Sequence, residues 1–179
     1  MTYGLVLGTV MATPLKPNIV IIYTDDQGYG DLSCNGGKVE TPEIDRMASE
    51  GARLTSFYMA APVCTPSRAS LMTGAYPPRV GMERGSVHGV LLPGDRKGLN
   101  PEELTIAEVA QEAGYKTAMF GKWHLGDQPE FLPTAQGFEL FYGLPYSHDI
   151  KPGRKGHQFP PLPMLAGEEV VELNPDPNY

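Results

Sequence analysis

The chain has 179 residues, of which 41% are hydrophobic and 20% charged, and its 14 basic and 21 acidic side chains give a formal charge of −7. This length and aliphatic content predict a folded core and exclude a disordered chain. The acidic balance argues against nucleic acid as the main partner, and no apolar run reaches the ~18 to 20 residues of a membrane span. Two cysteines are too few for a disulfide framework, and 21 glycines and 18 prolines predict abundant loops that carry the function.

The first residues, 1–14, form a short apolar stretch that admits two interpretations. Val10 and Ala12 are placed like positions −3 and −1 of a secretory cleavage site, which indicates a signal-peptide remnant. A signal peptide also has a basic start, and the first basic residue here is Lys16. The alternative is an ordinary buried strand or a frayed terminus.

The first half of the chain predicts a strand, a helix and a second strand. Residues 18–24 are a continuous β-branched run, which is typical of a strand buried on both faces of a sheet. A helix follows, with Thr41 as N-cap, Pro42 at its first position and Gly51 as its stop. Residues 53–59 are a further strand candidate.

The next elements repeat this alternation. Residues 65–74 predict a two-turn helix with Thr65 as cap, an early proline and a terminal glycine, and with Cys64 just before its start. A capping box at Thr105 opens a helix through Ala113, and residues 115–120 predict a second buried strand. Residues 168–173 predict a short strand. Alternating strands and helices indicate an α/β fold with a largely parallel sheet, which binds ligands beyond the carboxyl ends of its strands.

Two polar clusters fall where predicted strands end. Asp25 and Asp26 follow the first strand and offer the hard oxygen ligands that Ca²⁺ or Mg²⁺ prefers, although such a pair also serves as a simple solvated turn. Lys122 and His124 follow the second strand, and their alternation predicts that both point to one side, with Trp123 packed on the other.

Cys64 is the candidate nucleophile. At a helix N-terminus the unpaired backbone N–H groups favour an anion and make a cysteine reactive, whereas elsewhere a cysteine is more often a small buried hydrophobe. Arg68 lies one turn further along and can face the same site. Cations, a helix N-terminus and a divalent metal together suit a tetrahedral anion such as sulfate or phosphate, with a nucleophile at its centre.

Four ordered motifs resemble one family. Residues 64–68, Cys-Thr-Pro-Ser-Arg, resemble the C-[TSA]-P-S-R signature of the sulfatases, in the alkaline-phosphatase-like superfamily. Residues 25–31 are similar to its N-terminal metal-binding stretch, residues 121–126 to its G-K-W-H-L-G segment, and residues 145–149 to a later substrate-pocket segment of arylsulfatase-like members. The resemblance covers about residues 17–150.

The resemblance implies covalent catalysis by a modified cysteine. Cys64 would be oxidised to Cα-formylglycine by a formylglycine-generating maturation enzyme. One hydroxyl of the hydrated aldehyde would attack sulfur and displace the alcohol, and deprotonation of the other would expel sulfate and regenerate the aldehyde. Asp25, Asp26 and the modified Cys64 would bind Ca²⁺, with Mg²⁺ as the alternative.

The resemblance also implies roles for the remaining site residues. Arg68 would stabilise the formylglycine hydrate, Lys122 would bridge to the sulfate, and His124 would hold one hydroxyl and act as a base. Ser147 and His148 would bind substrate in the sulfate pocket, and the less favoured alternative for the Ser147 hydroxyl is that it caps a loop.

Three features depart from the family pattern or extend beyond the sequence. Ala75 stands where an arginine usually follows the Thr-Gly pair. Further metal ligands and a second catalytic histidine are expected beyond position 179. We therefore expect residues 15–179 to be a truncated N-terminal part of a sulfatase catalytic domain, incomplete at its C-terminus.

The resulting functional hypothesis is a sulfuric ester hydrolase. It would act on an aryl or carbohydrate sulfate ester, that is, a sulfated small molecule or glycan, in the periplasm or outside the cell. The alternatives are a phosphonate or phosphate monoester hydrolase of the same superfamily, and an inactive protein that binds an anion or glycan. A redox role for Cys64 is disfavoured because no resolving cysteine lies nearby in the sequence.

Overall fold

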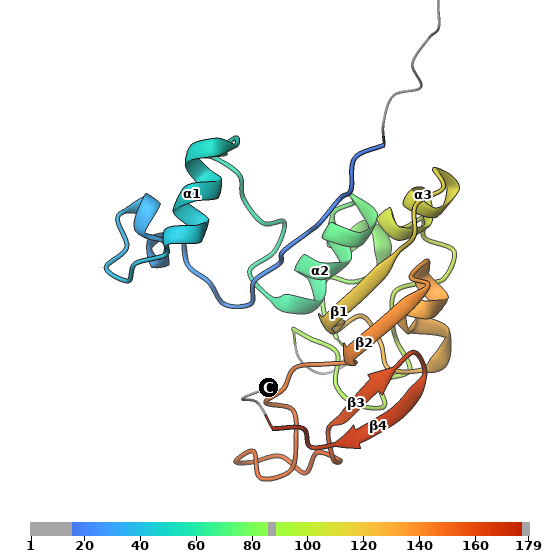
Figure 1. Cartoon of the computed structure of the whole chain (residues 1–179). Helices are drawn as coiled ribbons and strands as arrows, with labels where there is room; N and C mark the ends of the chain where they lie inside the picture. Colours follow the sequence, from blue (N-terminus) through green and yellow to red (C-terminus); the bar gives the residue numbers. More distant parts are fainter. Residues whose placement is uncertain (1–15, 86–88, 177–179) are drawn as a thin grey trace, which may run out of the picture. The chain divides into compact units, whose positions relative to one another are not determined.

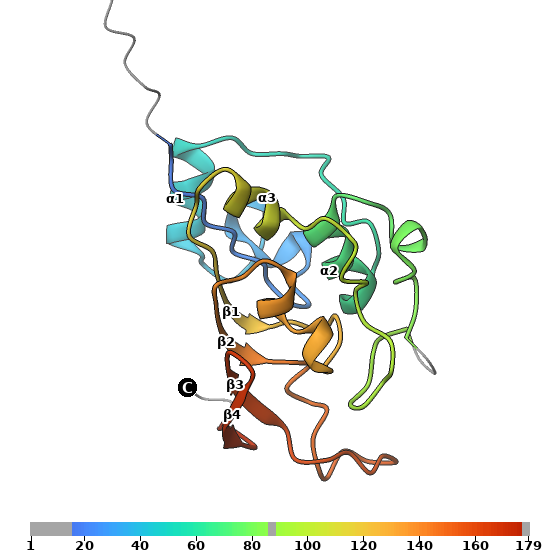
Figure 2. The same cartoon turned by 90° about the vertical axis from the view of Figure 1, so that its right-hand side faces the viewer.

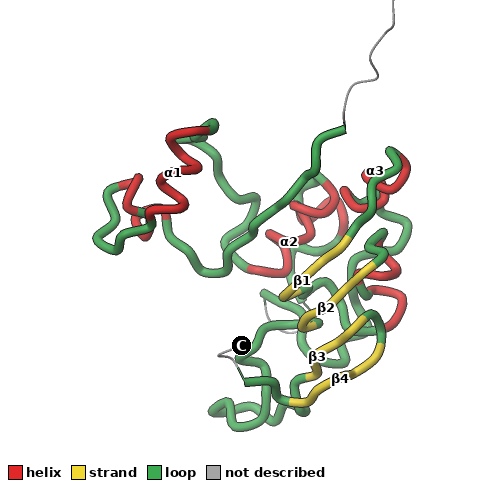
Figure 3. The backbone as a smooth tube through the Cα atoms, in the orientation of Figure 1, coloured by secondary structure: helices red, strands yellow, loops and turns green. Residues whose placement is uncertain are grey.

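The computed structural model describes residues 16–85 and 89–176, and these residues divide into two units at the Arg53–Leu54 link. Loops make up much of the chain (Figure 3), as its glycine and proline content predicts. The expected signal-peptide remnant at residues 1–14 lies outside the described residues, as does His88, for which an exposed loop position is expected.

The first unit consists of two short 3₁₀ turns, η1 (Tyr29–Asp31) and η2 (Ser33–Asn35), and helix α1 (Pro42–Glu50). The predicted boundaries of α1 are confirmed, with Thr41 as N-cap and Gly51 as C-cap. The Asp45 carboxylate accepts hydrogen bonds from the Ser33 hydroxyl (2.6 Å), the Cys34 amide (2.9 Å) and the Thr41 hydroxyl (3.0 Å). The bond from Ser33, above all, holds the pKa of Asp45 below its usual value.

The predicted buried strand over residues 18–24 is wrong. This segment forms no strand among the described residues, and Ile19, Val20 and Ile22 are 64 to 81% exposed. A β-branched run becomes a strand only when a neighbouring strand pairs with its N–H and C=O groups, and no described strand does so. The strand expected at residues 53–59 is absent from the described structure for the same reason.

The second unit is built on a four-stranded mixed sheet in the order β1-β2-β3-β4 (Figure 1), and it confirms the α/β class. Its strands are β1 (Ala118–Lys122), β2 (Leu140–Leu144), β3 (Pro163–Ala166) and β4 (Glu169–Leu173). The β1–β2 pair is parallel, and the β2–β3 and β3–β4 pairs are antiparallel, with a bulge between Met164 and Leu165.

Helices cover one face of this sheet. Helices α2 (Cys64–Thr73) and α3 (Ile106–Glu112) lie on the same side of it (Figure 2), together with the 3₁₀ turns η3 (Pro77–Val80), η4 (Pro129–Phe131) and η5 (Pro133–Gln136). Trp123 and Phe141 are 1% exposed in the core on that side, where they pack with Ala69, Leu99 and Leu125. The Trp123 indole also donates to the Phe131 carbonyl at 2.8 Å.

The other face of the sheet is exposed, so the expectation of a strand buried on both faces at residues 115–120 is wrong. Strand β1 begins three residues later, at Ala118, and Phe120 is 70% exposed. Leu140 and Tyr142 of β2 are about half exposed beside it. They line an open apolar hollow of about 460 Å³ that reaches Ala166 and Gly167.

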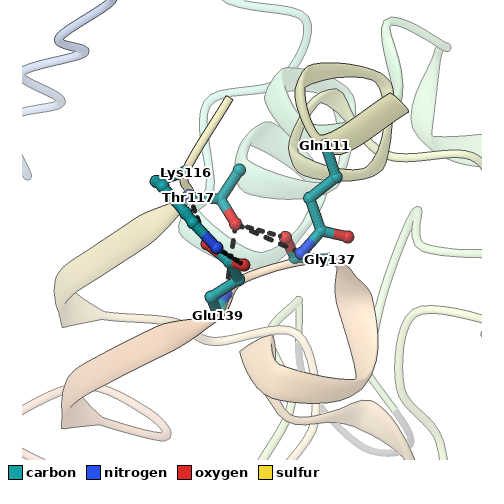
Figure 4. Close-up of polar contacts among 5 residues, drawn as sticks. All are labelled: Gln111, Lys116, Thr117, Gly137 and Glu139. Carbon is teal, nitrogen blue, oxygen red and sulfur yellow. Dashed lines mark hydrogen bonds and ion pairs between the residues drawn. The ribbon is translucent and has the colours of Figure 1, made fainter. Parts of the chain in front are cut away.

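A polar cluster at the start of β1 and β2 fixes the register of the parallel pair (Figure 4). The Thr117 hydroxyl donates to the Gly137 carbonyl (2.7 Å) and accepts from the Glu139 amide (3.1 Å). The Lys116 ammonium pairs with the Glu139 carboxylate at 2.7 Å, and Gln111 of α3 reaches Thr117 at 3.4 Å. This cluster therefore sets which residues face each other at the opposite, carboxyl end of the strands.

The Glu139 pair predicts a pH-dependent contribution to stability. The hydrogen bond from Lys116 holds the pKa of Glu139 below its usual value of 4.5. The pair's contribution to the free energy of unfolding is fully present above pH 4.5, the usual pKa of glutamate. It is lost as the pH falls through the lower pKa that Glu139 has in the folded state. We expect Glu139→Gln to lower the free energy of unfolding at neutral pH, and the difference from wild type to vanish in acid. Urea unfolding followed by Trp123 fluorescence at several pH values measures this. Lys116→Gln should reproduce the result, and a difference that does not change with pH would contradict it.

Candidate active site

The site is centred on the carboxyl ends of the parallel strands β1 and β2. Lys122 ends β1 opposite Leu144 of β2, and two further bonds extend the pairing, because Trp123 and His124 donate their amides to the carbonyls of Leu144 and Pro145, each at 2.9 Å. The Lys122 ammonium then donates to the Ser147 hydroxyl at 3.3 Å. Residues that lie 25 positions apart in the sequence are thereby brought together.

Helix α2 is attached to the same strand end by two side chains from its first turns. The Thr65 hydroxyl donates to the His124 carbonyl at 3.0 Å, and the Arg68 guanidinium donates to the Lys122 carbonyl. Both side chains are buried, with Thr65 fully covered and Arg68 8% exposed. Arg68 thus lies at the predicted site, one turn after Cys64.

The start of α2 differs from the prediction by two residues. Val63 is the N-cap and the half-buried Cys64 is the first helical residue, so the expected capping role of Thr65 is wrong. Its hydroxyl bonds to other segments instead. Pro66 stands at the third helical position, where its missing N–H removes one of the donors that a helix start leaves unpaired.

His124 is buried and departs from an extended backbone. Its side chain is 1% exposed, and its φ of 65° lies in the left-handed region, so Lys122 and His124 do not alternate along a regular strand as expected. The ring Nε2 lies 3.0 Å from the Leu91 carbonyl oxygen. Trp123 packs into the core between them, as predicted.

The segment after β2 carries a second set of polar groups. The Ser147 side chain is buried, whereas His148 and Asp149 are exposed. Burial opposes the ionisation of Asp149, but hydrogen bonding from Ser147 and the charge of Arg154, whose guanidinium lies 2.6 Å away, hold the pKa of this carboxyl below its usual value. The neighbouring Tyr146 is buried, and desolvation, with the charge of Asp127, raises its pKa to about 12. Tyr146 therefore stays neutral beside the site at physiological pH.

The two aspartates expected to bind metal lie in the first unit, whereas Cys64 lies in the second. Asp25 and Asp26 form a turn in which Asp26 has a φ of 58°. Their adjacent carboxylates have the hard-oxygen chemistry that Ca²⁺ prefers. Within residues 16–85 and 89–176, no cluster of three or more carboxylate, imidazole or thiol groups is placed to hold a metal ion, so the metal assignment stays a prediction.

The chemistry of the second unit's strand end suits an oxyanion. A lysine ammonium, an arginine guanidinium and a helix N-terminus all favour negative charge, and the burial of Arg68 strengthens its electrostatic attraction. Sequence reasoning identified Cys64, Arg68, Lys122, His124 and Ser147 as site residues. It missed Leu91, because this residue contributes only backbone groups and its side chain carries no signal. It also predicted that Thr65 caps α2, whereas the Thr65 hydroxyl bonds to the His124 carbonyl.

Comparison with known proteins identifies relatives of this chain, whose second unit carries an oxyanion-attracting cluster at the end of its parallel strands. This chain belongs to the sulfatase family, whose sequence model matches residues 17–162. It is 51% identical to human arylsulfatase A over 166 residues, which cover 91% of this chain and 32% of that protein. The chain thus spans about a third of the length of this curated relative.

Two solved structures support the family assignment. A structure from work on the metabolism of multiple glycosaminoglycans by Bacteroides thetaiotaomicron superposes with a TM-score of 0.73 at 34% identity, covering 91% of this chain and 33% of that one. A second, solved in complex with its substrate D-glucosamine-2-N,6-O-disulfate, gives a TM-score of 0.63 at 29% identity, covering 87% of this chain and 27% of the other. No helix in the described parts of the chain is long and apolar enough to cross a membrane.

Proposed function

We propose that this chain is the nucleophile-bearing part of a sulfuric ester hydrolase that cleaves sulfate from an aryl or carbohydrate sulfate ester. The observation that carries the proposal is the attachment of α2 to the end of β1, through the Thr65 and Arg68 side chains. It brings the Cys-Thr-Pro-Ser-Arg signature to the strand end that presents Lys122 and Ser147. Membership of the sulfatase family supports sulfate as the anion bound there.

The nucleophile and the metal are groups that the chain would acquire. In this proposal Cα-formylglycine, formed from Cys64 by a maturation enzyme, supplies the nucleophile when it is present. Asp25, Asp26 and the modified Cys64 would hold Ca²⁺, which would offset the negative charge of the sulfate. Both aspartate side chains have the oxygen donors that such a cation needs.

The residues of the chain itself would bind and orient the substrate. The Lys122 ammonium would attract the sulfate, and its bond to the Ser147 hydroxyl fixes its position. The buried Arg68 would add positive charge behind the nucleophile, while its bond to the Lys122 carbonyl keeps α2 against β1. His124 would accept a proton when sulfate leaves. His148, exposed directly after Ser147, would contact the part of the substrate that projects outward.

We infer a sulfated carbohydrate as the substrate class, because a structural relative was solved with a sulfated glucosamine as its substrate. The chain's net charge of −7 does not oppose this, since Arg68 and Lys122 place two cations at the site itself. We further propose that the protein acts after export, in the periplasm or outside the cell.

Conversion of Cys64 tests the proposal directly. We expect expression together with a formylglycine-generating enzyme to yield a Cys64 peptide lighter than the unmodified one, because replacing the thiol by an aldehyde removes mass. Peptide mass spectrometry measures the fraction converted, and Cys34, which lacks the Pro and Arg of the signature after it, serves as an internal control. A Cys64 that remains a thiol in a competent host would contradict the proposal.

The reaction class is tested on the protein that contains this chain, after its Cys64 has been converted to formylglycine. Turnover of an aryl sulfate should exceed turnover of the matching aryl phosphonate ester. The reverse preference would support the phosphonate hydrolase alternative, and binding of either ester without turnover would support an inactive anion-binding protein.

A further inference from the structure

Three buried residues from separate segments form a closed ring of hydrogen bonds beside the site. Thr65 lies in the first turn of α2, Leu91 in the loop before α3, and His124 after β1. Their exposed fractions are 0%, 2% and 1%, so water does not compete for their polar groups. We call these three residues the histidine clamp.

Two of the bonds in the histidine clamp have a direction that their atoms fix. The Leu91 amide donates to the Thr65 hydroxyl at 3.1 Å, and that hydroxyl in turn donates to the His124 carbonyl at 3.0 Å. The Thr65 oxygen thus fixes both Leu91 and the backbone of His124. The ring closes because the His124 Nε2 lies 3.0 Å from the Leu91 carbonyl oxygen.

The chemistry of a carbonyl determines where the proton of this histidine lies. A carbonyl oxygen only accepts hydrogen bonds, so the Nε2 atom that contacts it must carry a hydrogen. In a neutral imidazole the other nitrogen, Nδ1, then carries the lone pair. The backbone of Leu91 therefore selects one of two tautomers, a task that a second group commonly performs for functional histidines.

The strained backbone of His124 makes a positioning group necessary. A non-glycine residue with φ of 65° costs energy that the surroundings must offset, and here the bonds of its amide to Pro145 and of its carbonyl to Thr65 hold it. Loss of the Thr65 hydroxyl would remove one of these bonds and would also leave the Leu91 amide unpaired in the core.

We propose that Leu91 fixes His124 as the Nε2–H tautomer, and that Thr65 is the positioning residue that maintains this contact, so that Nδ1 is the proton-accepting atom. This inference rests on the proposed function for the role of His124 as a base. The hydrogen-bonded tautomer itself is a property of the folded chain and needs neither substrate nor a modified Cys64.

The test uses nuclear magnetic resonance of the full chain with ¹⁵N-labelled histidine and ¹³C-labelled leucine, with His124→Gln to assign the resonance. In the wild type we expect a slowly exchanging Nε2–H proton with a through-bond coupling to the Leu91 carbonyl carbon. In Thr65→Val, which keeps the buried volume, we expect that proton to exchange with solvent about tenfold faster, as loss of one hydrogen bond implies. Thr65→Ser, which keeps the hydroxyl, should restore the slow exchange.

Thr105→Val is the matched control. Thr105 is also fully buried, and its hydroxyl also makes two hydrogen bonds, one donated to the Gln136 carbonyl and one accepted from the Glu108 amide. This variant should lose stability without changing the exchange of the His124 proton.

A wild-type ring that carries its proton on Nδ1 would overturn the proposal, whether or not the Thr65 variant folds. Equal exchange rates in wild type and Thr65→Val would overturn the role of Thr65. Failure of sulfate ester hydrolysis would leave these spectra unchanged, so the two proposals fail separately.

Discussion

Replacing Cys64 by alanine is expected to lower turnover of an aryl sulfate more than about 10³-fold relative to the wild-type protein in which Cys64 has been converted to formylglycine. Enzymes lose activity on this scale when their nucleophile is removed. Alanine has no sulfur to oxidise, so the variant cannot form the aldehyde. The fold should persist, because Thr65 and Arg68 rather than Cys64 attach α2 to the strand end. Initial rates at saturating substrate, measured beside a thermal unfolding curve, separate lost chemistry from lost structure.

Cys34→Ala is the matched control for this prediction. Cys34 is half-buried like Cys64, and its thiol makes a long contact of 3.9 Å with the adjacent Asn35. This variant should keep wild-type turnover. If Cys64→Ala retained more than a small fraction of the activity while Cys34→Ala lost it, the assignment of the nucleophile would be wrong.

Local signals in the sequence predicted the helices well. The capping box of α3 is present as expected, since the Thr105 hydroxyl accepts from the Glu108 amide at 3.2 Å and the Glu108 carboxylate accepts from the Thr105 amide at 2.7 Å. Such contacts join residues three positions apart, so the sequence that specifies them is contiguous. The stop of α2 at Gly74, in the left-handed conformation, follows from the same kind of local rule.

Strands were predicted less well because their partners lie elsewhere in the chain. Residues 18–24 have the composition of a buried strand but no described partner. Conversely, β2 was missed although its apolar run between Gly137 and Pro145 carried a signal, and β3 was missed because it starts at a proline in a proline-rich segment. The short strand at residues 168–173 was predicted to within one residue, since β4 is Glu169–Leu173.

The candidate site likewise has a part that the sequence predicted, its side chains, and a part that it did not, the backbone groups of Leu91. The motifs identified the side chains at the strand ends, and the structure joins Arg68 to Lys122 and Lys122 to Ser147. The contribution of Leu91 could not be predicted, because every residue has the carbonyl and amide that it uses. Residue type predicts what a side chain can do, whereas the fold determines which backbone groups face it.

Gly143→Ala is expected to destabilise the second unit by about 3 kcal/mol, at the upper end of what overpacking a core usually costs. Gly143 of β2 pairs with Gly121 of β1, and an added Cβ would lie 2.0 Å from the Gly121 carbonyl oxygen. That neighbour is backbone in the parallel pair, so no side chain can rotate away, and the strands must separate. Because Lys122 follows Gly121 directly, the same displacement should break its bond to Ser147.

Urea unfolding followed by the fluorescence of Trp123 measures the effect, because this is the chain's one tryptophan and it is buried in the core of the second unit. Gly89→Ala, in the same unit, is the matched control: the added Cβ would meet only the Val63 side chain, at 3.6 Å, which is ordinary packing, and its free energy of unfolding should change by less than about 1 kcal/mol. In the converted protein, Gly143→Ala should also raise the KM for an aryl sulfate where it remains folded, since Lys122 is displaced. A variant as stable as wild type would mean that β1 and β2 do not approach this closely, and the joining of Lys122 to Ser147 through the parallel pair would have to be abandoned.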